Sequence, residues 1–166
     1  EQARLLASAR RRLLAARRRR QQPGRDDKVL VAWNALMIEG LIRAARIFVR
    51  SDWLAAARRG IDFIRATLWH GGRLSATWRA GRARLPAYLD DHAFLLSALL
   101  ESLQADFRPE DLAFAEALAE TLLSRFEDKA AGGFHFTAHD HEPLILRPKP
   151  YQDHALPAGN GVAALA

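Results

Sequence analysis

Two stretches of the sequence place the same chemically active residue types ahead of an apolar run. Asp91-His92-Ala93 follows Tyr88 in "YLDDHAFLL", and Asp153-His154-Ala155 follows Tyr151 in "YQDHALPAGNGVAA", 62 positions later. Carboxylates and imidazoles are common general acids and bases. An Asp where a helix begins is also a favoured cap, because its carboxylate accepts hydrogen bonds from free backbone N–H groups. The pattern therefore indicates either chemistry or helix capping.

The spacing of apolar residues predicts the elements that position these side chains. Helical periodicity marks segments of about 2–20, 28–49, 51–68, 88–105 and 109–126, and a last helix begins after Asp153 or Pro157. Glycine pairs with short alternating segments, in 69–86 and again in 131–150, predict small β-hairpins.

The same periodicity predicts which faces are buried. In the last complete helix these are Leu112, Phe114, Leu118, Leu122 and Phe126, and the Arg58-Arg59 pair of the third helix is expected to face solvent. In the second helix the expected buried stripe is Leu30, Trp33, Leu36, Met37, Leu41, Ala44 and Ile47 or Phe48.

Acids recur at a nearly constant interval along the chain. Asp27, Asp91 and Asp153 are 64 and 62 positions apart, an interval that two helices and a hairpin fill. Such a repeat predicts an all-α fold, an α/α toroid or an α-solenoid. Parallel inner helices would bring the acids to one rim, which suits a polyhydroxylated ligand. With three inner helices, residues 1–166 are expected to form a single partial domain, a fragment of a ring. This fragment would contain about three helical hairpins, each an outer and an inner helix, with short β-hairpins at one end.

Composition narrows the function classes. The chain has 166 residues, 49% hydrophobic residues and no Cys, which excludes disulfides and Cys-ligated metals within it. It lacks a membrane-length apolar stretch and the apolar core of a signal peptide, so we expect a soluble, cytoplasmic protein with no membrane partner. The net charge is +6, but eight arginines fall in residues 1–20 without any nucleic-acid-binding motif. We therefore expect no nucleic-acid partner.

Four motifs together resemble a known family. "RDDKVLVAWNALMIEGL", "YLDDHAFLLSALLE", "GGFHFT" and "EPLILRPKPYQDHALPAGNGVAA" are similar to the C-terminal part of the spermatogenesis-associated protein 20 family, whose bacterial members contain a thioredoxin-like domain. The resemblance implies part of an (α/α)6 barrel similar to N-acylglucosamine 2-epimerases and six-hairpin glycosidases. The thioredoxin-like domain is absent from this chain.

The resemblance also points to site residues. The family's Arg-Asp-Asp-Lys, Trp-Asn, Asp-Asp and Arg-Pro-Lys motifs match residues 25–28, 33–34, 90–91 and 147–149. Three positions depart from the pattern: Ala35 replaces a usual Gly, His92 a common Tyr, and Ala158 a usual Ser. The catalytic candidates are Asp91, Asp153, Asp27 and His92. The ligand-binding candidates are Arg25, Trp33, Asn34, Tyr88, Asp90, Arg147 and Lys149.

Each candidate also has a structural interpretation. Adjacent helical residues diverge by about 100°, so at most one of Asp90 and Asp91 can point at a barrel axis. Trp33 is as compatible with the core as with a sugar-stacking platform, and the rim arginines and lysines can pair with the acids. "HFTAHDH", residues 135–141, lacks the spacing of a helical metal site, so no metal and no other cofactor is predicted.

Two functions are compatible with these residues. The first is a carbohydrate-active barrel, an isomerase or glycoside hydrolase whose rim carboxylates act on a carbohydrate-like small molecule. The alternative is a noncatalytic scaffold or ligand-binding domain in which the acids and arginines are structural. A partial ring would leave apolar helix faces uncovered, so we also expect self-association.

Overall fold

The computed structural model describes residues 1–166, which form six helices and a small antiparallel sheet. None of the helices has the length and apolar character that a membrane span requires. The helix bounds agree with those predicted from periodicity to within a few residues. The helices are α1 (Gln2–Arg18), α2 (Val31–Phe48), α3 (Ser51–Thr67), α4 (Leu89–Ala105), α5 (Pro109–Arg125) and α6 (Gly159–Leu165).

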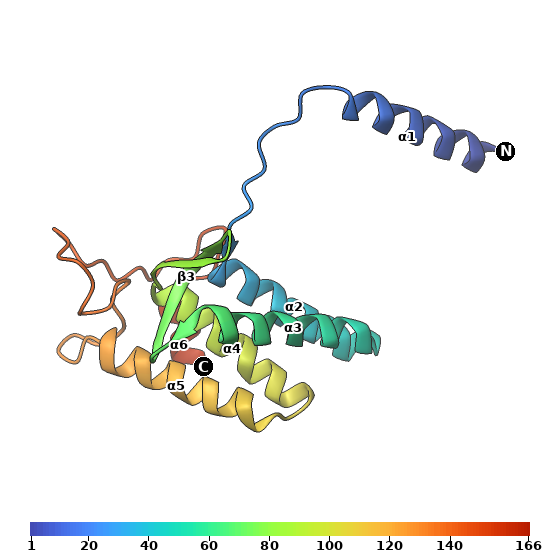
Figure 1. The fold of residues 1–166 in the computed structure, drawn as a ribbon. Helices are drawn as coiled ribbons and strands as arrows, with labels where there is room; N and C mark the ends of the chain where they lie inside the picture. Colours follow the sequence, from blue (N-terminus) through green and yellow to red (C-terminus); the bar gives the residue numbers. More distant parts are fainter.

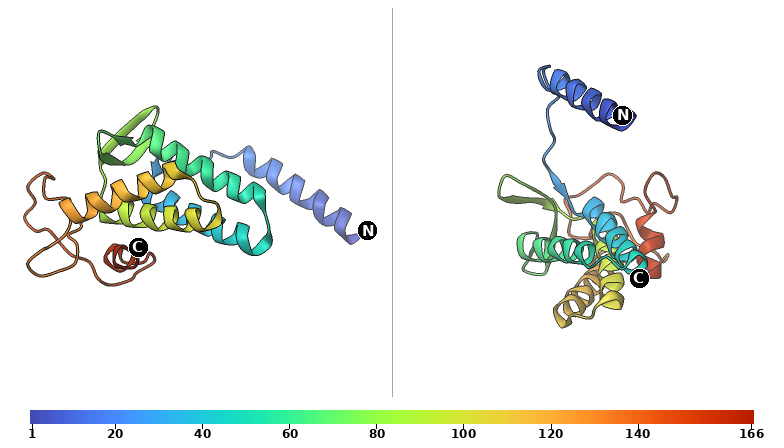
Figure 2. Two further views of the ribbon diagram at one scale, coloured as in Figure 1. Left: turned by 90° about the horizontal axis from the view of Figure 1, so that it is seen from below. Right: turned by 90° about the vertical axis from the view of Figure 1, so that its right-hand side faces the viewer.

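Helices α2, α4 and α6 form an inner row, with α3 and α5 outside it. Helix α4 packs against both α2 and α6, α3 packs on α2, and α5 packs on α4. The two views of Figure 2 show this alternation, with α3 and α5 antiparallel to their inner partners. The prediction of inner and outer helices is therefore confirmed for α2 to α6.

Helix α1 stands apart from this assembly. None of its residues is buried, and residues 19–28 lead away from it to the packed part of the chain, as Figure 1 shows. Its leucines, Leu5, Leu6, Leu13 and Leu14, are all exposed. The expected third hairpin, with α1 as an outer helix, is therefore not formed, and the chain contains two packed hairpins and α6.

The sheet covers the end of the molecule where the inner helices begin. Strand β3 (Arg73–Arg79) pairs with β4 (Arg82–Pro86) along one edge and with β1 (Val29–Leu30) and β2 (Trp69–His70) along the other, all antiparallel. Gly71 and Gly72 join β2 to β3 with φ of +57° and +72°, values that favour glycine in a two-residue hairpin turn. The first predicted hairpin is thus confirmed.

The second predicted hairpin is not formed. Residues 131–150 contain no strand, and only one isolated bridge, between Glu127 and Phe134, closes the glycine pair Gly132-Gly133. Pro143, Pro148 and Pro150 remove backbone donors from this segment, which prevents a regular ladder. The segment is a long loop between α5 and α6.

The core lies where α4 meets its neighbours. Phe94, Leu95 and Leu99 of α4 are fully buried against aliphatic residues of α2, α3 and α5. Phe114, Leu118, Leu122 and Phe126 are buried as predicted, whereas Leu112 is 37% exposed.

The predicted stripe of α2 was wrong in part. The buried residues of α2 are Val31, Ala35, Ile38, Ile42 and Ala45. Trp33, Met37, Ile47 and Phe48 are instead 62–74% exposed. Because α2 is apolar on several sides, its periodicity does not decide which side faces the core. The side that carries Ala35, Ile38 and Ile42 is the buried one.

An ion-pair network ties α3 to the start of α5. The fully buried Asp111 carboxylate accepts hydrogen bonds from Arg65 at 2.7 Å and from Arg108 at 2.7 and 2.8 Å. Asp62 accepts from the same two arginines. Arg58, expected in solvent, is half-buried and pairs with Asp106 beyond the end of α4, whereas Arg59 is exposed as predicted.

Candidate functional site

Asp91 connects the first turns of α2 and α4. It is the third residue of α4 and only 5% exposed. Its Oδ2 accepts the Tyr88 N–H and its Oδ1 accepts the Ala32 N–H, each at 2.9 Å. Burial raises the pKa of Asp91 to about 6, although the two backbone hydrogen bonds act in the opposite direction. The carboxylate therefore caps two helices at once.

Asp90 faces the third inner helix. A Cβ at position 159 would collide with Asp90 Oδ1, so only glycine allows α6 to begin this close to α4. Asp90 Oδ1 is buried without a well-aligned hydrogen bond, and burial raises the pKa of Asp90, whereas the Gly159 backbone lowers it. Asp90 and Asp91 thus diverge toward different helices, and the starts of α2, α4 and α6 meet around them.

Asp27 and Asp153 occupy different positions from Asp91. Both are exposed and lie in the loops before α2 and α6, not inside the helices. Asp27 pairs with Arg79 of β3 at 2.5 Å, and Asp153 accepts the Ala158 N–H at 2.8 Å. The predicted equivalence of the three acids is therefore wrong, because repeated sequence spacing does not fix where each helix begins. A catalytic role for them stays a prediction.

His92 is buried and neutral. It is 3% exposed, its Nδ1–H donates to the Tyr88 carbonyl at 2.9 Å, and its ring centroid lies 4.9 Å from that of Phe126. Burial lowers the pKa of His92 to about 4, so at neutral pH the imidazole is uncharged and its Nε2 is an acceptor. His154 is exposed in the loop, so the two histidines are not equivalent.

The aromatic and amide candidates are dispersed. Tyr88 stacks on Phe136, with ring centroids 5.0 Å apart. Trp33 is exposed, and the Asn34 side chain donates to the Leu30 carbonyl at 2.8 Å. Arg25 is exposed in the segment before α2 and has no hydrogen bond or ion pair. Only Tyr88 lies beside the paired acids.

The two basic ligand-binding candidates in the long loop, Arg147 and Lys149, form hydrogen bonds and an ion pair with residues 128–137. Arg147 Nη2 donates to the Thr137 carbonyl at 2.7 Å. Lys149 Nζ pairs with Asp128 at 2.7 Å, which holds the pKa of Asp128 well below its usual range and raises that of Lys149. Sequence reasoning missed Asp128 as the partner. No group of three or more His, Asp or Glu side chains is arranged to hold a metal ion.

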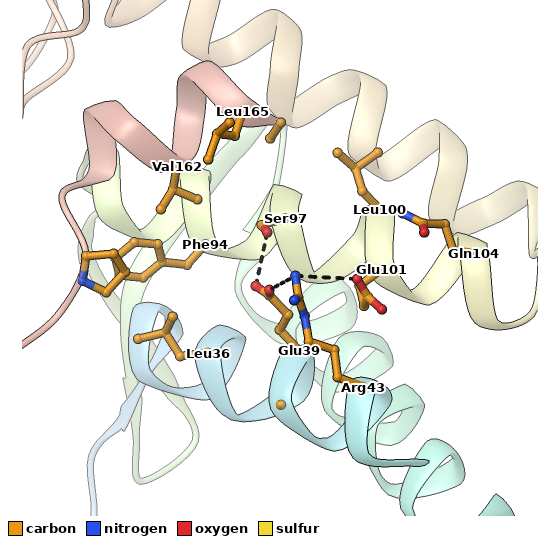
Figure 3. Close-up of a pocket in the computed structure, with 13 residues that line it drawn as sticks. Leu36, Glu39, Arg43, Phe94, Ser97, Leu100, Glu101, Gln104, Val162 and Leu165 are labelled. Atoms are coloured by element: carbon orange, nitrogen blue, oxygen red, sulfur yellow. Dashed lines mark hydrogen bonds and ion pairs between the residues drawn. The ribbon is translucent and has the colours of Figure 1, made fainter. Parts of the chain in front are cut away.

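A groove along the inner row contains charged residues that sequence reasoning missed. It has a volume of about 550 Å³ and lies between α2, α4 and α6 (Figure 3). Within it, Ser97 Oγ donates to Glu39 at 3.0 Å, and Arg43 pairs with Glu39 at 2.8 Å and with Glu101 at 3.5 Å. Leu36, Phe94 and Val162 form its apolar end. The groove combines clustered donors and acceptors with an apolar wall.

The sequence is related to curated proteins over most of its length. No protein-family model matches the chain. Spermatogenesis-associated protein 20 of Mus musculus is 31% identical over 150 residues, which cover 84% of this chain and 19% of that protein. The Homo sapiens protein is 31% identical over 154 residues, which cover 86% of this chain and 20% of that protein. The chain is homologous to one segment of spermatogenesis-associated protein 20. It spans about a fifth of the length of these relatives.

Solved structures show a similar arrangement of helices. Cellobiose 2-epimerase from Spirochaeta thermophila matches with a TM-score of 0.64 and 18% identity, over 76% of this chain and 33% of that one. D-mannose isomerase matches with a TM-score of 0.52 and 17% identity, over 60% of this chain and 27% of that one. At this identity the similarity establishes the fold alone: the chain matches part of an epimerase-type α/α barrel.

One pattern in the sequence could have revealed the groove. Glu39 is the only acid in α2, and Arg43 follows it at i+4 in a mostly apolar helix. Glu101 and Ser97 show the same i,i+4 relation in α4. A charged pair within an apolar inner helix indicates a polar wall, because isolated charges are costly to bury.

Proposed function

We propose that this chain forms part of the inner wall of an α/α barrel and that its groove binds a carbohydrate-like small molecule. The reaction class we propose is sugar isomerisation or epimerisation. The fold it shares with a cellobiose 2-epimerase and a D-mannose isomerase supports this class only by analogy. The observation that favours the proposal most is the polar network inside the groove.

The chemistry of the network suits sugar hydroxyls. Each hydroxyl both donates and accepts, and the groove offers carboxylate acceptors on Glu39 and Glu101 beside guanidinium donors on Arg43. Both carboxylates remain accessible, with side chains 19% and 12% exposed. Phe94 and Val162 supply an apolar surface for the C–H face of a sugar ring. The groove would then bind the ligand, and the acids at the helix starts would position the helices.

The bonds of Asp91 favour a second candidate function. Both of its oxygens accept backbone N–H groups, as expected of a capping carboxylate in a noncatalytic scaffold. In that case the groove network would only join α2 to α4. The two candidates differ in whether the groove binds a ligand.

Calorimetry of the protein with mannose, cellobiose and N-acetylglucosamine distinguishes them. The barrel proposal predicts saturable binding of at least one sugar, weakened about tenfold by Glu39→Gln, which corresponds to about 1.4 kcal/mol. The matched control is Glu120→Gln on α5, whose exposed side chain lies outside the groove. Absence of binding, or equal weakening by the two variants, would contradict the proposal and support the scaffold function.

A further inference from the structure

A second pocket lies apart from the groove. It has a volume of about 270 Å³ and is bounded by strands β3 and β4, the end of α5 and residues 138–141. It shares no lining residue with the groove. This volume is slightly below the range of about 300–1,000 Å³ that is typical of drug-sized ligands, so the pocket suits a small molecule.

Three arginines and one acid give the pocket an excess of positive charge. Arg73 and Arg125 donate to the same oxygen, Asp140 Oδ2, at 2.5 and 2.9 Å. The third arginine, Arg84 of β4, has no side-chain hydrogen bond or ion pair, although it also lines the pocket. Since a guanidinium has five N–H donors, most donors of these arginines are available to a ligand.

The Asp140 carboxylate also limits how much negative charge the pocket can take. The neighbouring arginines hold the pKa of Asp140 below its usual range, so it is ionised at neutral pH. With Asp140 ionised, the three arginines still leave the pocket with a net positive charge, so it attracts an anion. A carboxylate also matches the planar fork of donors on a guanidinium.

His92 adds an acceptor from the floor of the pocket. It lines the pocket while being 97% buried, with a relative exposure of 3%. Its Nδ1–H is occupied by the Tyr88 carbonyl, which is the only side-chain hydrogen bond of His92, so its Nε2 is unpaired. A neutral imidazole nitrogen that lines a pocket can accept a hydrogen bond from a ligand hydroxyl.

We propose that this pocket binds a small hydroxylated carboxylate, with arginine donors on the carboxylate and a ligand hydroxyl donating to His92 Nε2. Leu74, Ala87 and Phe126 would contact the carbon chain. The site is independent of the sugar-binding groove, because the two have no residue in common.

Gluconate and sorbitol are matched probes, since they share a six-carbon polyol chain and differ in the carboxylate. Calorimetry at pH 7 is expected to show saturable gluconate binding and no comparable binding of sorbitol. Arg84→Gln should weaken gluconate binding at least about fivefold through loss of a charge-assisted hydrogen bond. Arg82→Gln, on the same strand but outside the pocket, should change the affinity for gluconate by less than about twofold.

A second readout tests the role of His92. In ¹⁵N NMR spectra, the His92 Nε2 resonance should shift on addition of gluconate. Glu120→Gln, which lies outside both pockets, should leave gluconate binding unchanged. The proposal is overturned if gluconate does not bind, if sorbitol binds equally, or if Arg82→Gln weakens binding as much as Arg84→Gln. An unchanged His92 resonance at saturation would equally overturn the assigned hydroxyl contact.

Discussion

A single carboxylate links two helix starts in this fold. Asp91 accepts one N–H from its own helix and one from α2, so its charge interacts with both N-terminal dipoles. The neighbouring Asp90 abuts α6 through the only residue type that fits there, Gly159. The capping interpretation of the repeated acids is thus realised at Asp91, by contacts that link residues 59 positions apart in the sequence.

We expect Asp91→Asn to destabilise the fold. The carboxamide can accept only one of the two N–H groups, and its own NH₂ would face the other, which should cost about 1–3 kcal/mol of unfolding free energy. Urea unfolding at pH 7 measures this. Asp26→Asn, in the exposed loop before α2, should behave like the wild type. A variant as stable as the wild type would show that the double cap contributes nothing.

The stability difference between wild type and Asp91→Asn should depend on pH. Burial raises the pKa of Asp91 from 3.8 to about 6, so the folded state binds this proton more tightly than the unfolded state. Its contribution is fully present below about pH 4 and is lost as the pH rises to about 6. The gap should therefore widen on acidification from pH 6 to 4.

His92 acts in the opposite direction over nearly the same range. Its pKa is lowered from 6.5 to about 4 by burial, so protonation of the unfolded state lowers stability as the pH falls from 6.5 to 4. The Asp91→Asn variant keeps the destabilising effect of His92 but lacks the stabilising protonation of Asp91. Its free energy of unfolding should therefore fall more steeply on acidification than that of the wild type. Urea titrations at pH 6.5, 5.5 and 4.5 would reveal this, and parallel pH profiles would be inconsistent with it.

Sequence reasoning located some functional candidates and missed others for a physical reason. Asp91 and His92 were found because they precede an apolar run, a local pattern. Glu39, Glu101 and Asp128 matter through partners far away in the sequence or in a loop. Only tertiary packing brings such residues together, so local spacing identifies few of them.

Among the elements, α6 packs on α4 and is also bonded through its first turn to the long loop that precedes it. The buried Asn160 side chain accepts the Phe134 N–H at 2.7 Å and donates to the carbonyls of Phe134 and Pro150 at 2.9 and 3.0 Å. These three bonds replace the ladder that the prolines prevent. They fix the loop to the first turn of α6.

Asn160→Ala should therefore loosen the loop. It leaves the Phe134 N–H and C=O without these partners, and we expect a loss of about 1–3 kcal/mol together with faster hydrogen exchange at Phe134. Asn34→Ala is the matched control, because Asn34 is exposed and makes one local hydrogen bond. Unchanged exchange at Phe134 would show that other contacts hold the loop.

The positions of the helices could be predicted from the sequence. The buried face of α2 and the segments that pair as strands could not. The strong periodicity of α3, α4 and α5 fixed their bounds within a few residues. Helix α2, apolar on several sides, left its buried face undecided, and Trp33 and Met37 proved exposed. The glycine pair at 132–133 resembled that at 71–72, but only the first pair is followed by residues able to pair as strands.

At the scale of the whole molecule, several large apolar side chains of α2 are exposed to solvent. Trp33, Met37, Ile47 and Phe48 are each more than 60% exposed. We expect the 166-residue chain to self-associate at micromolar concentrations, because such surface is normally covered. Met37→Lys should shift sedimentation profiles toward monomer, and Leu144→Lys, in the exposed loop, should not. A monodisperse wild-type monomer would contradict this expectation.

The most direct test of ligand binding by the inner row is an NMR titration of the protein with mannose and cellobiose. If the groove binds sugar, amide shifts should cluster at Glu39, Ser97, Glu101 and Val162 and should saturate. Absence of shifts for both sugars, or shifts confined to the outer helices α3 and α5, would contradict a binding groove and make the polar network a structural contact between α2 and α4.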